Sequence, residues 1–134
     1  MFPGSTKGGG ICFAFPDVCK TPVGPSVVPI PYPNIGTVNQ AKKTADKVKF
    51  VGKQVVTKKS EMPRSSGDEP GVVKGVVSSK NMGKVTYKKC SSKVKIQGQP
   101  CAHLLSTTGH NGANANHPAG AQIAPSQTKV IVAP

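Results

Sequence analysis

The sequence has no Trp, only four Phe and two Tyr among its 134 residues, and only five Asp and Glu. So few large apolar side chains cannot wall a deep cleft, and a large pocketed enzyme fold is therefore not expected. No apolar run reaches 18 residues, so we expect no integral membrane segment. Long helices are disfavoured as well, because 15 Gly and 13 Pro interrupt the chain.

The positive charge is large and comes almost entirely from lysine. There are 18 Lys and Arg, of which Arg64 is the only arginine, and the formal net charge is +13. Proteins that read bases use arginine forks, and single-strand binders use aromatic platforms. Both are scarce, so we expect no specific nucleic-acid partner. A basic nucleic-acid-binding module stays as an alternative, and an acidic protein partner is compatible with the charge.

The first 20 residues do not follow the order of a signal peptide, in which a basic region precedes an apolar one and a cleavage site. We therefore expect synthesis in the cytoplasm and export only by a machine that needs no signal peptide. Cytoplasmic origin disfavours disulfides between the four cysteines. Since three histidines are also present, a metal site is the alternative use of these thiols.

The chain divides into a flexible entry at residues 1–10 and a single β domain at 11–134. Residues 11–34 are rich in proline, which excludes helix and favours extended or polyproline backbone. Residues 37–47 are the one place for a short helix, because Ala41 and Ala45 are spaced by four.

From residue 48 onward, apolar and basic residues alternate in short segments separated by glycine. This pattern predicts strands at 48–50, 84–88, 93–96 and 128–132, and hence an all-β fold. A repeat supports it: KVKFVG at 47–52 recurs as KVKIQG at 93–98. Repetition of a strand–glycine unit indicates equivalent hairpins in a pseudo-symmetric structure.

No catalytic constellation stands out among the carboxylates. Asp68 and Glu69 are adjacent and would point to opposite faces of a strand, so they cannot converge as an acid/base pair. Residues 67–71 are interpreted as a turn, and there is no nucleophile-elbow motif. We therefore predict that the protein is not an enzyme, with a Cys–His hydrolase as the open alternative.

The C-terminal third holds the residue types that ligate metals. His103, His110 and His117 are spaced by seven, and Cys101 lies two residues before the first of them. Loops can bring His and Cys together on a tetrahedral zinc ion. The alternative is a cluster of Asn and Gly turns whose side chains bond the neighbouring backbone.

Three segments, FPDVCKTP at 15–22, VPIPYPN at 28–34 and SSGDEPG at 65–71, resemble the PAAR-like proteins of bacterial type VI secretion systems. The resemblance covers about residues 11 to 120. It implies a small conical β-hairpin or β-prism fold that caps and sharpens the trimeric valine-glycine repeat (VgrG) spike. Such a tip can carry or recruit effector cargo and is exported by the secretion machine. We expect a stand-alone structural tip, with a small secreted effector as the alternative.

The resemblance also implies one structural zinc ion near the apex, held by three histidines and a cysteine. Cys19 falls where the first histidine ligand of the family lies, and His110 and His117 fall roughly where the last two lie. Nothing after the first hairpin supplies the middle histidine. Cys101 is the choice for the fourth ligand, with Cys12 and His103 as alternatives. Cys90 is expected to be a core thiol.

Overall fold

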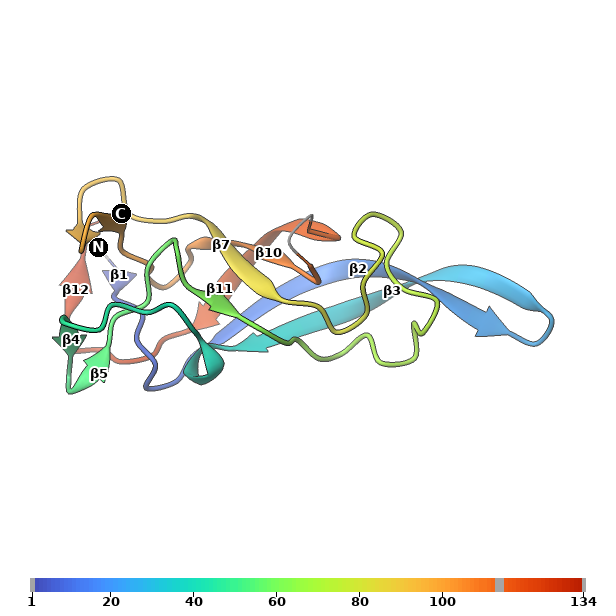
Figure 1. Ribbon diagram of the computed structural model, residues 1–134, viewed down its shortest axis with the longest axis horizontal. Helices are drawn as coiled ribbons and strands as arrows, with labels where there is room; N and C mark the ends of the chain where they lie inside the picture. Colours follow the sequence, from blue (N-terminus) through green and yellow to red (C-terminus); the bar gives the residue numbers. More distant parts are fainter. Residues whose placement is uncertain (1, 113–114, 134) are drawn as a thin grey trace.

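The computed structural model describes residues 2–112 and 115–133, and it is elongated, with a broad end that tapers to a narrow end (Figure 1). Within these residues the regular elements are β-strands, apart from one 3-10 turn at Val38–Gln40. The all-β prediction is thus confirmed. The two ends of the chain, which are farthest apart in sequence, both lie at the broad end.

A six-stranded antiparallel sheet runs along the molecule in the order β3-β2-β11-β10-β7-β6. Its strands are β2 (Ile11–Val23), β3 (Ser26–Thr37), β6 (Glu61–Met62), β7 (Val85–Lys89), β10 (Thr107–His110) and β11 (His117–Ala124). Only β2 and β3 reach the narrow end, where they form a long hairpin closed at Gly24. Gly24 has a φ of +58°, which a two-residue hairpin turn requires at this position.

The prolines of this hairpin lie where a missing N–H costs no hydrogen bond. Lys20 is paired with Pro29, but its N–H donates to the carbonyl of Lys74, on the side away from β3. The nitrogen of Pro29 therefore also points away from β2, because the donors of such a pair face outward together. Pro31 lies two residues further along β3 and has the same orientation. The proline-rich segment is extended, as predicted, and its outer edge offers few donors to another strand.

Three short hairpins form the broad end. They pair β4 (Lys49–Phe50) with β5 (Lys53–Gln54), β8 (Lys95–Ile96) with β9 (Gln99–Pro100), and β1 (Phe2–Pro3) with β12 (Ile131–Val132). The first two hairpins are the two copies of the sequence repeat, as predicted. The third pairs the two ends of the chain, and its strand KVIV at 129–132 begins with Lys-Val like the other copies but has Ile131 in place of their second lysine. The repeat thus has three copies, of which one is split between the termini.

A closed ring of backbone hydrogen bonds holds the three hairpins together. The N–H of Ser5 donates to the carbonyl of Ala102 (2.9 Å), that of Ala102 to Val56 (3.0 Å), and that of Val56 back to Ser5 (2.9 Å). All three residues are fully buried. Because each donates to the next in the same way, the broad end has approximate three-fold symmetry within a single chain.

Residues 2–10, which the sequence predicts to be a flexible entry, contain regular and buried segments. Phe2–Pro3 is a strand, Ser5 is a member of the ring, and both Ser5 and Thr6 are buried. The prediction of flexibility rested on the glycines at 8–10, which follow these buried residues in the sequence.

Two apolar cores fill the broad half. The broad-end core, between the three hairpins, consists of Ala45, Val55, Cys101 and Val132. The middle core, under the sheet, consists of Cys12, Val38, Ala41, Val56, Met62, Val85, Tyr87 and Ala102. Val48 and Val94 pack against the broad-end core while the lysines on either side of them are exposed, and the third hairpin contributes Val132 to this core. The alternation in the sequence therefore marks the inner and outer faces of the strands, as predicted.

The helix expected at 37–47 is reduced to the single 3-10 turn. Ala41 is already extended, with ψ at 139°, because Ala41 packs into the middle core and Ala45 into the broad-end core. The backbone between them bonds across to neighbours, as Lys42 donates to the carbonyl of Glu61. Tertiary pairing thus overrides the local helix preference of two alanines.

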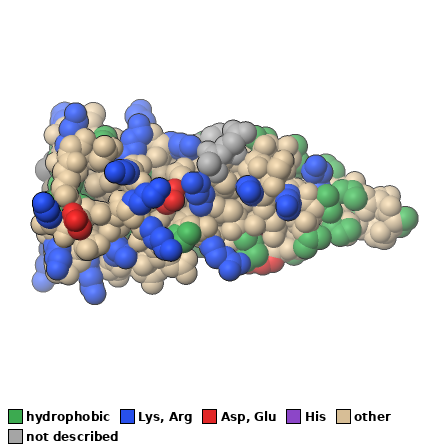
Figure 2. Space-filling model, viewed as in Figure 1, with side chains coloured by type: hydrophobic (Ala, Val, Ile, Leu, Met, Phe, Trp, Pro, Cys, Tyr) green, Lys and Arg blue, Asp and Glu red, His purple; other side chains and the backbone are tan. Residues whose placement is uncertain are grey.

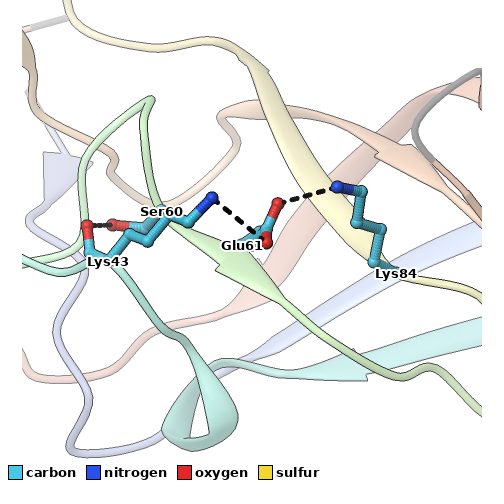
Figure 3. Close-up of polar contacts among 4 residues, drawn as sticks. All are labelled: Lys43, Ser60, Glu61 and Lys84. Atoms are coloured by element: carbon cyan, nitrogen blue, oxygen red, sulfur yellow. Dashed lines mark hydrogen bonds and ion pairs between the residues drawn. The ribbon is translucent and has the colours of Figure 1, made fainter.

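Glu61 links this segment to the central sheet (Figure 3). Its carboxylate lies 3.1 Å from the Nζ of Lys84 and 3.7 Å from that of Lys43. The hydrogen bond from Lys84 lowers the pKa of Glu61. The hydroxyl of Ser60 donates to the carbonyl of Lys43 beside it (3.1 Å). The pairs of Glu61 with Lys84 and with Lys43 are the ion pairs found among the described residues, so most lysines have no carboxylate partner in this part of the chain.

The hairpin turns yield a stability prediction. Val51 has a φ of +53° and Gln97, its counterpart, a φ of +50°. A β-branched residue is strained in this left-handed region, whereas Asn tolerates it. Val51→Asn should therefore raise the free energy of unfolding by about 1 kcal/mol, as measured by urea denaturation. Gln97→Asn is the matched control and should gain less; a lower midpoint for Val51→Asn would contradict the strain.

Candidate functional site

The narrow half contains a buried group of two carboxylates and a thiol, which we call the Asp–Cys–Asp cluster: Asp17, Cys19 and Asp68. Asp17 and Cys19 lie two residues apart on β2, so their side chains share a face. Asp68 comes from the long loop between β6 and β7. One ligand atom of each lies within 4.8 Å of the others, and all three residues are fully buried. Acidic groups at this depth need a proton, a cation or strong hydrogen-bond donors.

The cluster is held together by contacts with the loop. The Sγ of Cys19 lies 3.7 Å from Oδ1 of Asp17 and 3.7 Å from Oδ2 of Asp68. The backbone N–H of Met82 donates to both carboxylate oxygens of Asp68, at 3.2 and 3.3 Å. The end of the loop that precedes β7 therefore orients Asp68 toward Asp17 and Cys19.

Three asparagine amides surround Asp17. Asn34 donates to its Oδ2 (3.1 Å), Asn111 donates to its Oδ1 (3.2 Å), and Asn116 also donates to Oδ1. Asn111 lies 3.6 Å from the Sγ of Cys19 as well. The amide oxygens of Asn111 and Asn116 accept backbone N–H groups elsewhere, which fixes the orientation of both amides. In protein metal sites, hydrogen-bond donors of this kind contact the ligating side chains and fix their orientation.

Burial and the neighbouring carboxylates disfavour the charged forms of Cys19 and Asp68. Burial, together with the neighbouring carboxylates, raises the pKa of the Cys19 thiol to about 12. Burial and the adjacent Asp17 raise the pKa of Asp68 to about 7. A divalent cation would reverse both shifts, because it stabilises thiolate and carboxylate together. Two oxygens and a sulfur are ligands that zinc accepts, so the cluster fits a metal ion.

His110 is tied to the cluster through a shared asparagine. Its Nδ1 pairs with Oδ1 of Asn34 (2.8 Å), the same side chain whose amide nitrogen donates to Asp17, and its Nε2 pairs with Thr108 Oγ1 (2.8 Å). Burial lowers the pKa of His110 to about 4, and the nearby His117 adds to the shift. The ring is therefore neutral at physiological pH. Both of its nitrogens are engaged, so ligating a metal would require it to release one partner.

The predicted ligands are divided between two regions. Cys19 is in the cluster, His110 is one side chain away from it, and His117 pairs with His110 across β10 and β11. Cys101 instead lies in the broad-end core, packed with Val55 and Val132. The structure thus brings three of the four predicted residues into one half of the molecule and leaves Cys101 in the other.

The remaining candidates also lie outside the cluster. Cys12 is in the middle core, 3.6 Å from the Tyr87 hydroxyl. The ring of His103 stacks on Phe2 at the broad end, with centroids 5.3 Å apart. Cys90 is half-buried against the middle core, and all four cysteines are free thiols.

Sequence reasoning missed both carboxylates of the cluster. Asp17 could have been found, because it lies two residues before Cys19 in a segment predicted to be extended. Asp68 could not, because only the fold of its loop brings it to β2. Both residues lie within the sequence segments on which the resemblance rests.

Comparisons with known proteins find relatives for the part of the chain that carries this site. The model of the toxin PAAR-like domain family matches residues 10–117, which include the whole Asp–Cys–Asp cluster. The DNase toxin Tse7 of Pseudomonas aeruginosa is 42% identical over 108 residues, which cover 75% of this chain. The matched part is only 28% of that toxin. No solved structure matches the chain.

Two predictions change with this relative. The prediction that the protein is not an enzyme is overturned, since the relative is named as a DNase toxin. The prediction of no specific nucleic-acid partner loses its support for the same reason. Among the described residues, no helix has the length and apolar character needed to cross a membrane.

Proposed function

The chain belongs to the toxin PAAR-like domain family, as the resemblance suggested, and we propose that it forms the tip of a type VI secretion spike. In this role its broad end sits on the blunt end of the trimeric VgrG protein and its narrow end points outward. It is made in the bacterial cytoplasm, carries or recruits effector cargo, and leaves the cell on the spike.

The observation that carries this proposal is a set of three unpaired strand edges at the broad end. The strands β4, β8 and β12 each pair with one neighbour only, within a two-stranded sheet. At the centre of these strands, Lys49, Lys95 and Ile131 face Gln54, Pro100 and Pro3. The carbonyls of these three partners point away, because they accept N–H groups from the next segment of the ring. The backbone donors of Lys49, Lys95 and Ile131 therefore point to the outer edge, where a further strand can add.

The three-fold arrangement fits a trimeric partner. A trimer presents three identical edges, and a single chain can match them only with three equivalent edges of its own. The ring of Ser5, Val56 and Ala102 sets these edges around one axis. The narrow end, in contrast, exposes proline and valine and shows little charge on the face in Figure 2.

Docking can be tested by removing one outer donor. Lys95→Pro deletes the N–H that faces the outer edge and breaks no bond of its own hairpin. We expect this variant to lose co-purification with the VgrG trimer of the source bacterium, at an unchanged melting temperature. Lys95→Ala is the matched control, because it removes the same side chain but keeps the N–H, and it should still bind. If the native protein ignores the trimer, the proposal fails.

We further propose that the Asp–Cys–Asp cluster holds a structural zinc ion. When bound, the ion supplies positive charge that offsets the buried carboxylates and thiolate and joins β2 to the loop that carries Asp68. Asn34, Asn111 and Asn116 hold the ligand side chains in place by hydrogen bonds. Structural zinc contributes on the order of 10 kcal/mol to the folding of small domains, which suits a half that lacks an apolar core. The set Cys19, Cys101, His110 and His117 stays as the competing prediction.

Metal analysis of purified variants separates the two ligand sets. We expect about one zinc per native chain, as other structural sites hold, and its loss in Cys19→Ser and in Asp68→Asn. Cys101→Ser should retain the metal, as should Asp46→Asn, which changes an exposed carboxylate in the same way. Loss of zinc from Cys101→Ser with retention in Asp68→Asn would instead support the competing set.

A second proposed function is that the protein acts on DNA as part of a nuclease toxin. The observation that favours it is the 42% identity to a DNase toxin, over 28% of that protein. The test is conversion of supercoiled plasmid to nicked DNA by the purified chain with Mg²⁺ or Zn²⁺. Cleavage that is lost in Asp17→Asn but kept in Asp46→Asn would assign the activity to the cluster. No cleavage by the native chain would contradict a nuclease role for it.

A further inference from the structure

The three copies of the broad-end repeat begin with the same residue. Lys47, Lys93 and Lys129 each precede a valine whose carbonyl accepts a hydrogen bond inside its hairpin: Val48 from Val55, Val94 from Cys101 and Val130 from Gly4. The three lysines, here called the lysine triad, therefore occupy equivalent positions around the approximate three-fold axis. All three are exposed, whereas the valines that follow them are half-buried.

The backbone of each triad residue is fixed by a side-chain oxygen. The N–H of Lys47 donates to Oε1 of Gln97 (3.4 Å), that of Lys93 to Oγ of Ser91 (3.2 Å), and that of Lys129 to Oε1 of Gln127 (2.7 Å). For Lys93 and Lys129 the acceptor lies two residues earlier in the chain, whereas for Lys47 it belongs to another hairpin, so each backbone is bonded but by a different partner. The triad is thus an ordered feature of the broad end.

No carboxylate of the described residues forms an ion pair with the triad. The ion pairs that occur go to Glu61, from Lys43 and Lys84. Asp46 is next to Lys47 in sequence and forms no ion pair with it; the hydrogen bond from Gln97 Nε2 (3.0 Å) and, to a smaller extent, the charge of Lys47 lower the pKa of Asp46. Asp17 and Asp68 are buried in the narrow half. Lysines also crowd the broad half of the surface (Figure 2), and their mutual repulsion favours a partner that brings negative charge.

We propose that the lysine triad is an electrostatic docking element for a three-fold partner that presents one carboxylate per subunit. The inference rests on the proposed function, because the partner is the VgrG trimer that meets the free strand edges. The edges bind through backbone and carry no side-chain information, so they cannot by themselves distinguish one spike from another. Three lysines at matching positions allow the tip to select its partner. A trimer with basic side chains there would be repelled, and one with uncharged side chains would leave the lysines unpaired.

The test compares two triple variants that carry the same change of charge. One variant neutralises the triad as Lys47→Gln, Lys93→Gln and Lys129→Gln. The control neutralises three exposed lysines of the narrow half, as Lys20→Gln, Lys74→Gln and Lys80→Gln. Affinity for the purified VgrG trimer of the source bacterium is measured between about 50 and 300 mM NaCl, a range over which exposed charges become strongly screened. Unchanged melting temperatures confirm that both variants are folded.

We expect the triad variant to bind about 3- to 100-fold more weakly at low salt, because each exposed ion pair contributes roughly a 1.5- to 5-fold effect. It should also lose most of the salt dependence, whereas the control should keep both the native affinity and its salt dependence. Equal binding by the triad variant and the native protein would overturn the triad while leaving spike docking intact. Absence of binding by the native protein would overturn both.

Discussion

The ring of backbone hydrogen bonds through Ser5, Val56 and Ala102 is the constraint on which the rest of the molecule depends. It joins the first residues of the chain to segments about 50 and 100 positions away, and each segment is held by the other two. The three hairpins, the broad-end core and the free edges all take their positions from it. Because its contacts are so distant in sequence, the broad end can form only when nearly the whole chain is present.

The narrow half solves a different problem, since it has almost no apolar core. Its interior is polar: Asp17, Asn34, Thr108, His110 and Asn111 are all fully buried. Buried polar groups are tolerated only when they are satisfied, and here they bond one another in a connected network. The network joins β2, β3, β10 and the β6–β7 loop at their side chains. A cation in the Asp–Cys–Asp cluster would therefore reinforce every element that reaches the narrow end.

The two ends of the molecule also differ in the strand edges and the charge that they expose. The broad end combines free strand edges with lysines, which suits a specific and charged partner. The narrow end has a hairpin whose prolines remove outward donors, and it exposes Val23, Val27 and Val28. A strand edge with few donors is a poor template for another strand. These differences support the proposal that a partner docks at the broad end, where many of the lysines lie.

Much of the fold was determined by the sequence alone: the β class, the extended proline segment and the two complete hairpins follow from residue alternation and turn chemistry, which act locally. The family resemblance was also readable from three short segments. The third hairpin could not be predicted from the sequence, because its two strands, 129–132 and 2–3, lie at opposite ends of the chain. The Asp–Cys–Asp cluster could not be predicted either, since Asp68 meets Asp17 and Cys19 only when its loop folds onto β2. Alternation and turns depend on neighbouring residues, whereas ring closure and ligand convergence depend on contacts that only the folded chain creates.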